Sequence, residues 1–441
     1  MPVEDSQTTA ADMVRRARAV TASDAWDLDR RFPVVMDRAD GASVWDVAGD
    51  RYVDFTSCSG AAPLGVGFAP VRDRIVAELQ RSGGILPGPL SALRVAVAER
   101  LKAIFPQMER FLFFRTGSCA TTAATRIARV HTGARTVLTS GYHGWHDWQL
   151  QYRPHLALPD RDPETEDFGY DLDRLLQIAQ RHNGVAAVIV TPEVNFFPQD
   201  YVLELEALVR KLGALLILDE VMTGFRYASG GYHTAAGVRP DLIALSKGLA
   251  NGVALSAVGG REDIMRAAER TYLGNTYQRE VTPFAAALAT MDAWAQTAAL
   301  ARIAAVGMRL MGGLNTVFAE AGVEAWALAW PTMFDVVFAD ARIGHLFCQE
   351  MWRRRFLMQY GGRFMPSAAT DDRDVDGALD TSVHALRTAL IRSAETNGDG
   401  FGPAAARFAA DHFGATAQTV NRWCRLHLGA AGSGSPAPET C

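Results

Sequence analysis

The sequence predicts an α/β protein in which a mainly parallel β-sheet is covered by helices and joined to a smaller α+β lobe. Between about residues 110 and 260, short apolar runs alternate with longer helical patterns, as they do in successive βα units. After about residue 305, apolar runs and helical patterns mix without that alternation. The 441 residues, of which 49% are hydrophobic, suffice for a large core and for more than one domain.

Each expected element follows from its local pattern. The first residues form a helical pattern, and residues 41–55 alternate apolar and polar side chains around an Ala-Gly-Asp turn, which is typical of a β-hairpin. Residues 69–105 are expected to be helical. The sheet is expected to use strands at 110–115, 135–140, 184–192, 214–220, 241–246 and 255–260, with helices at 119–131, 171–182 and 202–212. The smaller lobe is expected to contain an apolar run at 334–339 and helices at 345–356, 376–395 and 403–427, before a disordered tail from residue 430.

The composition argues against several classes of protein. The net charge of -5, without a Lys/Arg cluster interleaved with aromatics, argues against a nucleic-acid partner. Residues 1–20 hold no apolar stretch of the length that a signal peptide or membrane span needs, so we expect a cytoplasmic protein without a membrane contact. Five scattered cysteines indicate neither a disulfide framework nor a thiolate zinc site. His143 and His146 form His-x-x-His without a third ligand at suitable spacing, so no metal is expected.

Lysine is scarce in this chain. Only three of the 44 basic Lys and Arg residues are lysines, and two of them, Lys102 and Lys211, lie on polar faces of helical patterns. Lys247 instead ends an apolar strand, directly before Gly248. A free lysine is an ammonium at neutral pH, but it can form an imine with an aldehyde, which arginine cannot do. On this pattern alone, a solvated lysine at the end of a strand is the alternative.

A second apolar strand ends in two carboxylates, Asp219 and Glu220, 28 residues before Lys247. Ligands of open α/β sheets bind at the carboxyl ends of strands. If the aldehyde is that of pyridoxal 5'-phosphate (PLP), its ring nitrogen must stay protonated, which requires a buried carboxylate such as Asp219. An Asp that caps the next helix is the alternative.

Two further turns could complete such a site. Thr116, Gly117 and Ser118 stand between a strand and a helix, where backbone N–H groups can bind a phosphate; an ordinary helix cap is the alternative. Tyr142 and His143 follow another strand and could stack on a flat ring, although aromatic residues in such places more often belong to the core.

Together these motifs resemble the class III aminotransferases of the fold type I PLP enzymes, including the glutamate-1-semialdehyde aminomutase branch. The resemblance runs from about residue 30 to about residue 395. It rests, in family order, on GASVWDVAGDRYVDF, TGSCATTAATRIAR, GYHGWHD, LLILDEVMTGFR, PDLIALSKGLANGVALSAVGG and GNTYQREVTPFAAALAT.

The resemblance implies a role for each candidate residue. Lys247 would be the Schiff-base lysine and Asp219 the partner of the ring nitrogen, with Val221 packed on one ring face. The phosphate would lie at Gly117 and Ser118, Tyr142 or His143 would cover the other ring face, and Thr276 would reach the phosphate of the neighbouring subunit. A homodimer with shared active sites follows. The implied domains are an N-terminal segment at 1–68 that joins the C-terminal small domain at 306–429, a large PLP-binding domain at 69–305, and the tail at 430–441.

The expected activity is transfer of an amino group from a donor of the glutamate or alanine type to a carbonyl compound, with intermediates of secondary metabolism among the candidates. An aminomutase and a non-catalytic PLP-binding protein are the alternatives. The chain departs from the family pattern at Cys119, at Thr191-Pro192 and in the run QREVTPF after Thr276, and the last of these departures favours transfer. An arginine fork could bind a substrate carboxylate, and Arg31, Arg226 and Arg363 are the candidates, although in an arginine-rich chain a surface or structural cation is the better interpretation of each.

Overall fold

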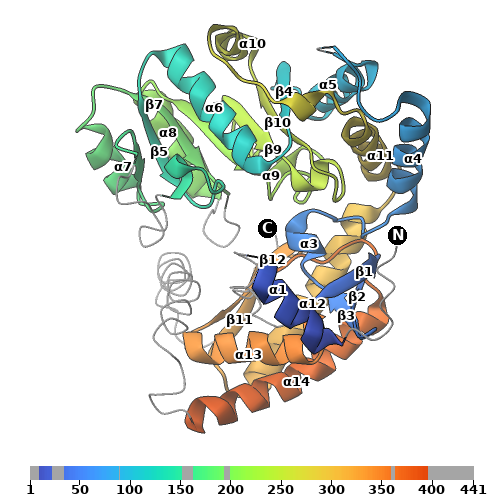
Figure 1. Cartoon of the computed structure of the whole chain (residues 1–441). Coiled ribbons are helices and arrows are strands. Elements are labelled where there is room, and N and C mark those ends of the chain that lie inside the picture. Colours follow the sequence, from blue (N-terminus) through green and yellow to red (C-terminus); the bar gives the residue numbers. More distant parts are fainter. Residues whose placement is uncertain are drawn as a thin grey trace.

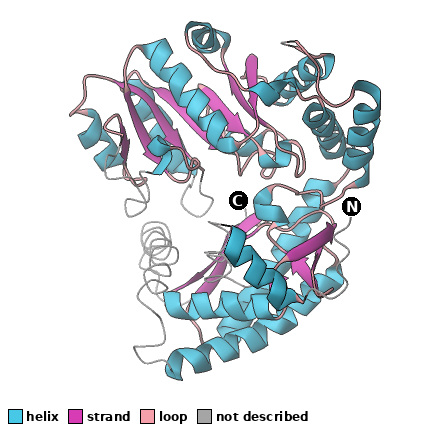
Figure 2. Ribbon diagram, in the orientation of Figure 1, coloured by secondary structure: helices cyan, strands magenta, loops and turns pink. Residues whose placement is uncertain are grey.

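The chain folds around three β-sheets, the largest of which carries the loops of the candidate site (Figures 1 and 2). The computed structural model describes residues 9–21, 34–88, 90–150, 162–192, 199–358 and 363–395. In spatial order, the large sheet has the strands β4 (Arg110–Phe114), β10 (Ser256–Gly260), β9 (Leu242–Leu245), β8 (Leu215–Glu220), β7 (Val185–Val190), β5 (Thr136–Ser140) and β6 (Thr165–Asp167).

The large sheet is mainly parallel, as the sequence predicts. The neighbouring pairs from β6 to β9 are all parallel, whereas β10 is antiparallel to both β9 and β4. All six expected strands are present, and the short strand β6 was not expected. Because β4 thereby points the same way as β5 to β9, the carboxyl ends of these strands meet at one edge of the sheet.

Helices cover both faces of the large sheet, which explains why its strands read as continuous apolar runs. Figure 1 shows α6 (Gly117–Thr132) lying across one face, where Ala124 and Ile127 join a core with Ile217 of β8. On the other face, α7 (Leu172–Ala179), α8 (Gln199–Lys211) and α9 (Gly231–Ala236) share a core with Leu216 and Leu218. Successive residues of β8 therefore point to opposite faces.

Three more helices lie at one end of this sheet. They are α4 (Ala69–Ser82), α5 (Ala92–Ile104) and α11 (Thr282–Gln296). Val97, Leu101 and Phe284 form their common core with Leu245 of β9. The helical assignment of residues 69–105 is confirmed, apart from the connection between α4 and α5.

A separate hydrophobic core combines the N-terminal Val53 and Phe55 with buried residues between 306 and 389. This core lies among two small sheets and three helices. One sheet has the strands β1 (Met36–Asp40), β2 (Ser43–Asp46), β3 (Arg51–Asp54) and β13 (Phe356–Leu357), and the other has β11 (Ala325–Trp330), β12 (Met333–Phe338) and β14 (Arg363–Phe364). The helices are α12 (Ala299–Glu320), α13 (Ala341–Arg353) and α14 (Asp372–Glu395). This shared core supports a small lobe built from both ends of the chain.

Two expectations for the chain ends have different outcomes. The hairpin at 41–55 is confirmed as β2 and β3, whose turn is held by the Asp46 carboxylate, 2.9 Å from the N–H groups of Ala48 and Asp50. A helix, α1 (Ala10–Val20), is present near the N-terminus. The expected helix at 403–427 and the tail lie outside the described residues.

Membrane-spanning character was tested on the described helices. None of them alone is long and apolar enough to cross a membrane. The successive helices α11 and α12 pass a test of length and composition together, but they are bent by 72° at their junction.

Gly307 of α12 lets this helix approach the turn between β11 and β12. A Cβ atom on Gly307 would lie 1.7 Å from the carbonyl oxygen of Pro331, whereas one on Gly312 of the same helix would meet nothing within 4 Å. We expect Gly307→Ala to lower the free energy of unfolding, by roughly 1–3 kcal/mol as overpacked cores do. Gly312→Ala should raise it by about 0.5–1 kcal/mol because alanine is the better helix former.

Urea denaturation of the two variants would measure both changes. Equal effects of the two substitutions would show that α12 does not approach the turn so closely.

Candidate active site

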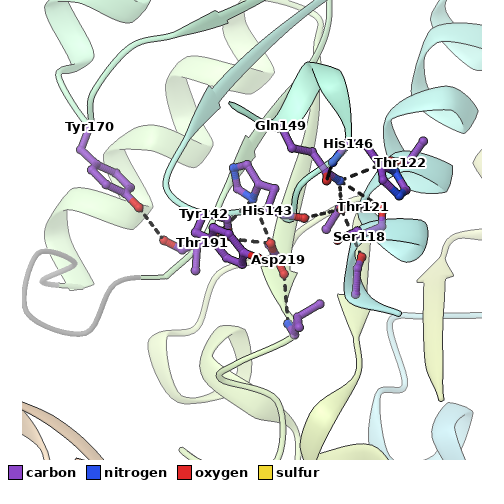
Figure 3. A network of polar contacts seen from close by, with 12 residues as sticks. Ser118, Thr121, Thr122, Tyr142, His143, His146, Gln149, Tyr170, Thr191 and Asp219 are labelled. Atoms are coloured by element: carbon purple, nitrogen blue, oxygen red, sulfur yellow. Dashed lines mark hydrogen bonds and ion pairs between the residues drawn. The ribbon is translucent and has the colours of Figure 1, made fainter. Parts of the chain in front are cut away.

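Loops from five strand ends meet at the carboxyl edge of the large sheet (Figure 3). The segment after β4 carries Gly117 and Ser118, the loop after β5 carries Tyr142 and His143, Thr191 follows β7, β8 carries Asp219 with Val221 after it, and Lys247 follows β9. The topology thus brings seven of the eight expected site residues to one edge. Thr276 is the exception.

The two carboxylates at the end of β8 point to opposite faces because side chains alternate along a strand. Asp219 shares its face with Ile217, which contacts the α6 core, and it is 2% exposed. Glu220 faces the other way, toward α9, and is fully buried. Only Asp219 therefore lies on the face of the sheet that α6 covers, where the turn at Thr116, Gly117 and Ser118 begins that helix.

Asp219 is held by three donors from three segments. Its Oδ2 atom lies 2.9 Å from Nδ1 of His143 and 3.4 Å from Oγ1 of Thr191, and its Oδ1 atom accepts the N–H of Val221 at 3.1 Å. Since a carboxylate only accepts, Nδ1 of His143 carries the proton in this contact. The contacts fix the orientation of the carboxylate at the sheet edge.

Glu220 binds groups of the protein on the other face of the sheet. Its carboxylate accepts the backbone N–H groups of Tyr232 and His233 at 2.7 and 2.9 Å, the Thr223 hydroxyl at 2.9 Å, and Nδ1 of His233 at 2.5 Å. Burial opposes its ionisation, but the hydrogen bonds and charge of His233 hold the pKa of Glu220 below its ordinary value. Glu220 thereby anchors the segment after β8 to α9.

Lys247 occupies a strained backbone position. Its φ angle is +42°, in the left-handed region that costs a non-glycine residue on the order of 1–2 kcal/mol. Its Nζ atom lies 3.5 Å from Sδ of Met222, and a Cβ atom on Gly60 would lie 3.6 Å from its Cδ atom. Strain of this kind concentrates at functional sites, where the surrounding structure maintains it.

A left-handed turn, α3 (Ser57–Gly60), approaches Lys247, and the sequence analysis missed it. Ser57, Cys58 and Ser59 have φ angles of +46°, +52° and +59°. The Asp54 carboxylate accepts the N–H groups of Thr56 and Cys58 at 2.7 and 2.8 Å, which stabilises the turn. Cys58 is an exposed residue, but the desolvation of its thiol by the surrounding turn, followed by the nearby Asp54, raises the pKa of the thiol to about 11, so this thiol is neutral at physiological pH.

The start of α6 is shaped for a close approach. Thr116 caps the helix through a 3.2 Å hydrogen bond from the N–H of Cys119 to its side chain, while the first N–H groups of a helix have no carbonyl partner within it. A Cβ atom on Gly117 would lie 2.8 Å from Cγ1 of Val221. A Cβ atom on Gly144 would lie 2.2 Å from Oγ of Ser118. Glycine is required at both positions for the loops to come this near.

The loop after β5 is tied to the first turns of α6 by a polar network (Figure 3). Gln149 donates to the Ser118 carbonyl at 3.0 Å and to Oγ1 of Thr121 at 2.7 Å, and Thr121 donates to the His143 carbonyl at 2.8 Å. The sequence analysis did not identify Gln149. The network fixes His143, and through it Asp219, relative to the turn at Ser118.

The two aromatic candidates differ in their environments. His143 is buried against Asp219, and its Nε2 atom is buried without a hydrogen-bond partner among the described residues. Tyr142 is half exposed, so its ring is accessible to a ligand. His146 lies 2.8 Å from the Thr122 hydroxyl, and the described residues contain no group of three His, Cys, Asp or Glu side chains that could hold a metal ion.

Thr276 begins the short helix η4 (Thr276–Arg279) and is exposed. The helix η4 lies outside the five loops that follow the strand ends. A contact with the phosphate of a neighbouring subunit stays a prediction.

The arginine candidates for a substrate carboxylate have structural partners. Arg226 is 1% exposed and donates to the carbonyl oxygens of Thr332 and Gly60 at 3.1 and 3.3 Å, and burial lowers its pKa to about 10. Arg363 binds both carboxylate oxygens of Asp335 at 2.8 and 2.9 Å. Arg31 lies outside the described residues.

Comparison with known proteins identifies related enzymes. The sequence matches the family Aminotransferase class-III over residues 27–325. The 2'-deamino-2'-hydroxyneamine transaminase of Streptomyces kanamyceticus is 38% identical over 341 residues, which cover 76% of this chain and 86% of that protein. The glutamate-1-semialdehyde 2,1-aminomutase of Methanothrix thermoacetophila is 32% identical over 330 residues, 70% of this chain and 76% of that protein.

Solved structures agree with the sequence matches. A PLP form of the FumI protein of Sphingopyxis sp. MTA144 has a TM-score of 0.80 at 27% identity and covers 87% of this chain and 97% of that one. The fold type I architecture and the PLP cofactor expected from the sequence are confirmed. The protein belongs to the class III aminotransferase family and is a PLP-dependent enzyme.

Proposed function

We propose that this enzyme moves an amino group from an amino donor to a separate carbonyl compound, with PLP held at the carboxyl edge of the large sheet. The placement of Lys247 and Asp219 at the ends of the neighbouring strands β9 and β8 carries this proposal. Asp219 of β8 pairs with Ala244 of β9, and Ala244 stands three residues before Lys247 in the sequence. An amine for the aldehyde and a carboxylate for the ring nitrogen thus come from the same ends of adjacent strands.

The residues present fit PLP. The Asp219 carboxylate is buried, and its partners are a histidine, a hydroxyl and a backbone N–H. A buried carboxylate is stabilised by a positively charged partner, and a protonated ring nitrogen would supply one. Gly117 and Ser118 at the start of the 16-residue helix α6 suit the phosphate, and Val221 beside Gly117 suits one ring face. For the other ring face we propose Tyr142, since His143 contacts Asp219.

Each residue then has a chemical role. When bound, PLP draws electrons from the carbon that bears the amino group and accepts that group. Lys247 would hold PLP through its Nζ atom, and the free amine of Lys247 would accept and return the proton of the substrate carbon. Asp219 keeps the ring nitrogen protonated, and His143 and Thr191 hold Asp219 in place.

For the carbonyl substrate we propose a hydroxylated amino sugar similar to the hydroxyneamine in the name of the Streptomyces relative. Among the described groups, Met222 and Gly60 of the turn α3 lie near Lys247, and Met365 lies next to Gly60. Arg226 and Arg363 are engaged elsewhere, so a substrate without a carboxylate suits this part of the site. An aminomutase is the second candidate, favoured by the relative from Methanothrix thermoacetophila.

The proposal extends to the oligomeric state, the domain boundaries and the location in the cell. We propose a homodimer in which Thr276 of the partner subunit reaches the phosphate, a division of the chain near residues 68 and 305, and a cytoplasmic location. The exposed position of Thr276 and the mixed core of the small lobe support the first two.

Lys247→Ala should abolish turnover, a loss of at least roughly 10²–10⁴-fold for a group that acts as general base, while the melting temperature stays close to that of the wild type. Borohydride reduction followed by peptide mapping should place the cofactor on Lys247. The exposed lysines provide matched controls, because Lys102→Ala and Lys211→Ala should keep full activity. A label on either of these two lysines would overturn the assignment.

Transfer and internal migration differ in what remains after one substrate has reacted. We expect enzyme treated with glutamate or alanine, and then freed of small molecules, to aminate an added carbonyl substrate in a second, separate step. Mass spectrometry of the released keto acid and of the aminated product would follow the two halves. Conversion of one compound to its isomer, with no keto acid released from any donor, would establish the aminomutase instead.

Gly117→Ala should weaken PLP binding because the new Cβ atom would lie 2.8 Å from Cγ1 and 3.0 Å from Cγ2 of Val221. Overpacking of about 1–3 kcal/mol corresponds to a loss of affinity of roughly 5- to 150-fold. In a Val221→Ala background the nearest remaining atom, Cβ of residue 221, is 3.4 Å away, so Gly117→Ala should then have little further effect. Fluorescence titration of the apoenzyme measures all four proteins, and an equal loss in both backgrounds would contradict the packing argument.

A further inference from the structure

Arg115 stands between β4 and the turn at Thr116, Gly117 and Ser118, which is proposed to bind the phosphate. Its guanidinium reaches the segment that carries Thr276. One nitrogen, Nη1, donates to the carbonyl oxygen of Ala254 at 3.1 Å. The other, Nη2, donates to the carbonyl oxygens of Tyr277 and, at 3.4 Å, Glu280, and lies 3.2 Å from the Glu280 carboxylate. The side chain is only 15% exposed.

The segment at 275–281 has few other attachments in a protomer. Its far end pairs with residues 84–86, through bonds of 3.1 Å from Leu86 N–H to the Arg279 carbonyl and 2.9 Å from Val281 N–H to the Gly84 carbonyl. The turn at Tyr277, directly after Thr276, is held by Arg115. Arg115 therefore sets how far Thr276 stands from β4.

Two groups at this junction are incompletely satisfied within the protomer. Nε of Arg115 and both polar atoms of the Asn275 side chain are buried without a hydrogen-bond partner among the described residues. Buried polar groups are normally paired, so each of these groups needs an explanation. Both lie at the junction between β4 and the segment that carries Thr276, so this junction is packed without full hydrogen bonding.

We propose that Arg115 is a positioning residue that couples the two phosphate-binding segments of the dimer. On one side it directly precedes the turn at Thr116, Gly117 and Ser118, which serves the site of its own protomer. On the other side it holds the segment that presents Thr276 to the site of the partner. This inference rests on the proposed homodimer with shared sites.

The geometry requires arginine at this position. Its two terminal nitrogens reach carbonyl oxygens of two segments, those of Ala254 and Tyr277, and its charge faces Glu280. Lysine would keep the charge on a single nitrogen and lose the planar fork that spans the two segments. Arg115→Lys should therefore resemble Arg115→Met in cofactor binding while preserving the charge near Glu280.

Titration of the apoenzyme with PLP and with pyridoxal, which lacks the phosphate, provides the first test. Arg115→Met and Arg115→Lys should weaken PLP binding roughly tenfold, the effect of about one charge-assisted hydrogen bond, and leave pyridoxal binding unchanged. A loss for both ligands would instead indicate general damage to β4 and would overturn the proposal.

Arg126 provides the matched control. It is an exposed arginine of α6 that donates to the carbonyl oxygen of Tyr272, at 3.1 Å, in the stretch leading to Thr276. Unlike Arg115, it contacts neither η4 nor Glu280 in the described structure. Arg126→Met should leave the affinities for both ligands at their wild-type values.

Mixed dimers separate an effect on the partner's site from one on the protomer's own site. A chain with both Lys247→Ala and Arg115→Met, paired with a wild-type chain, leaves one competent Lys247 whose Thr276 comes from the altered chain. The reciprocal dimer pairs a Lys247→Ala chain with an Arg115→Met chain, so the competent site receives its Thr276 from a chain with Arg115. Borohydride labelling of Lys247 at increasing PLP concentrations reports only on the competent site.

We expect the first dimer to need roughly tenfold more PLP for half-maximal labelling than the second. A deficit in the second dimer alone, or in neither, would overturn the role of Arg115. Thr276→Ala distinguishes this failure from that of the shared site. If Thr276→Ala weakens PLP binding while the Arg115 variants do not, only the inference fails; if Thr276→Ala has no effect on PLP binding, the proposed shared site fails with it.

Discussion

The buried carboxylate of Asp219 is the constraint on which the site depends. A carboxylate that is 2% exposed must be surrounded by donors, and here the donors come from the ends of three strands of the large sheet. His143 can donate only if the loop after β5 lies close to α6. That closeness in turn requires glycine at 144, because any side chain there would collide with Ser118. One buried charge thus links the ring-nitrogen end of the proposed cofactor site to its phosphate end.

The neighbouring carboxylate shows how one strand end can serve two purposes. Glu220 points away from the site and receives two N–H groups of α9 together with the His233 ring. This anchor holds the segment that carries Val221, Met222 and Arg226, each of which borders the site or its supports. Asp219 makes none of these contacts to α9, which leaves it for the ligand role proposed above.

Sequence patterns predicted the large sheet, and they predicted which residues gather at its carboxyl edge, because both depend on local features. The strands are buried on both faces, so each appears as an apolar run, and the parallel topology brings Asp219 and Lys247 to the same edge. The scarcity of lysine made Lys247 stand out. The alternation along β8 could have assigned Asp219 and Glu220 to opposite faces, but not which face holds the ligand.

Other parts of the site depend on contacts between residues far apart in the sequence. The turn α3 has three non-glycine residues in the left-handed region, which no propensity favours, and it persists because Asp54 and a hydrogen bond from Ser57 to Met365, 308 residues away, hold it. Nothing in the local sequence around Gln149, between Trp148 and Leu150, or around Arg115, between Phe114 and Thr116, marks either residue. Their partners become visible only when the loops are placed in three dimensions.

The residues proposed to hold the cofactor and those proposed to face the substrate belong to different parts of the fold. The groups proposed to hold PLP belong to the large sheet and its loops, whereas the groups nearest Lys247 on the open side belong to segments that contact the small lobe. Arg226 connects these segments, since its guanidinium donates to Gly60 of α3 and to Thr332 of the turn between β11 and β12. Although burial lowers its pKa to about 10, Arg226 stays protonated at neutral pH and keeps both bonds. Arg226 therefore ties the turn α3, which approaches Lys247, to the small lobe, whereas Asp219 is held by groups at the strand ends of the large sheet.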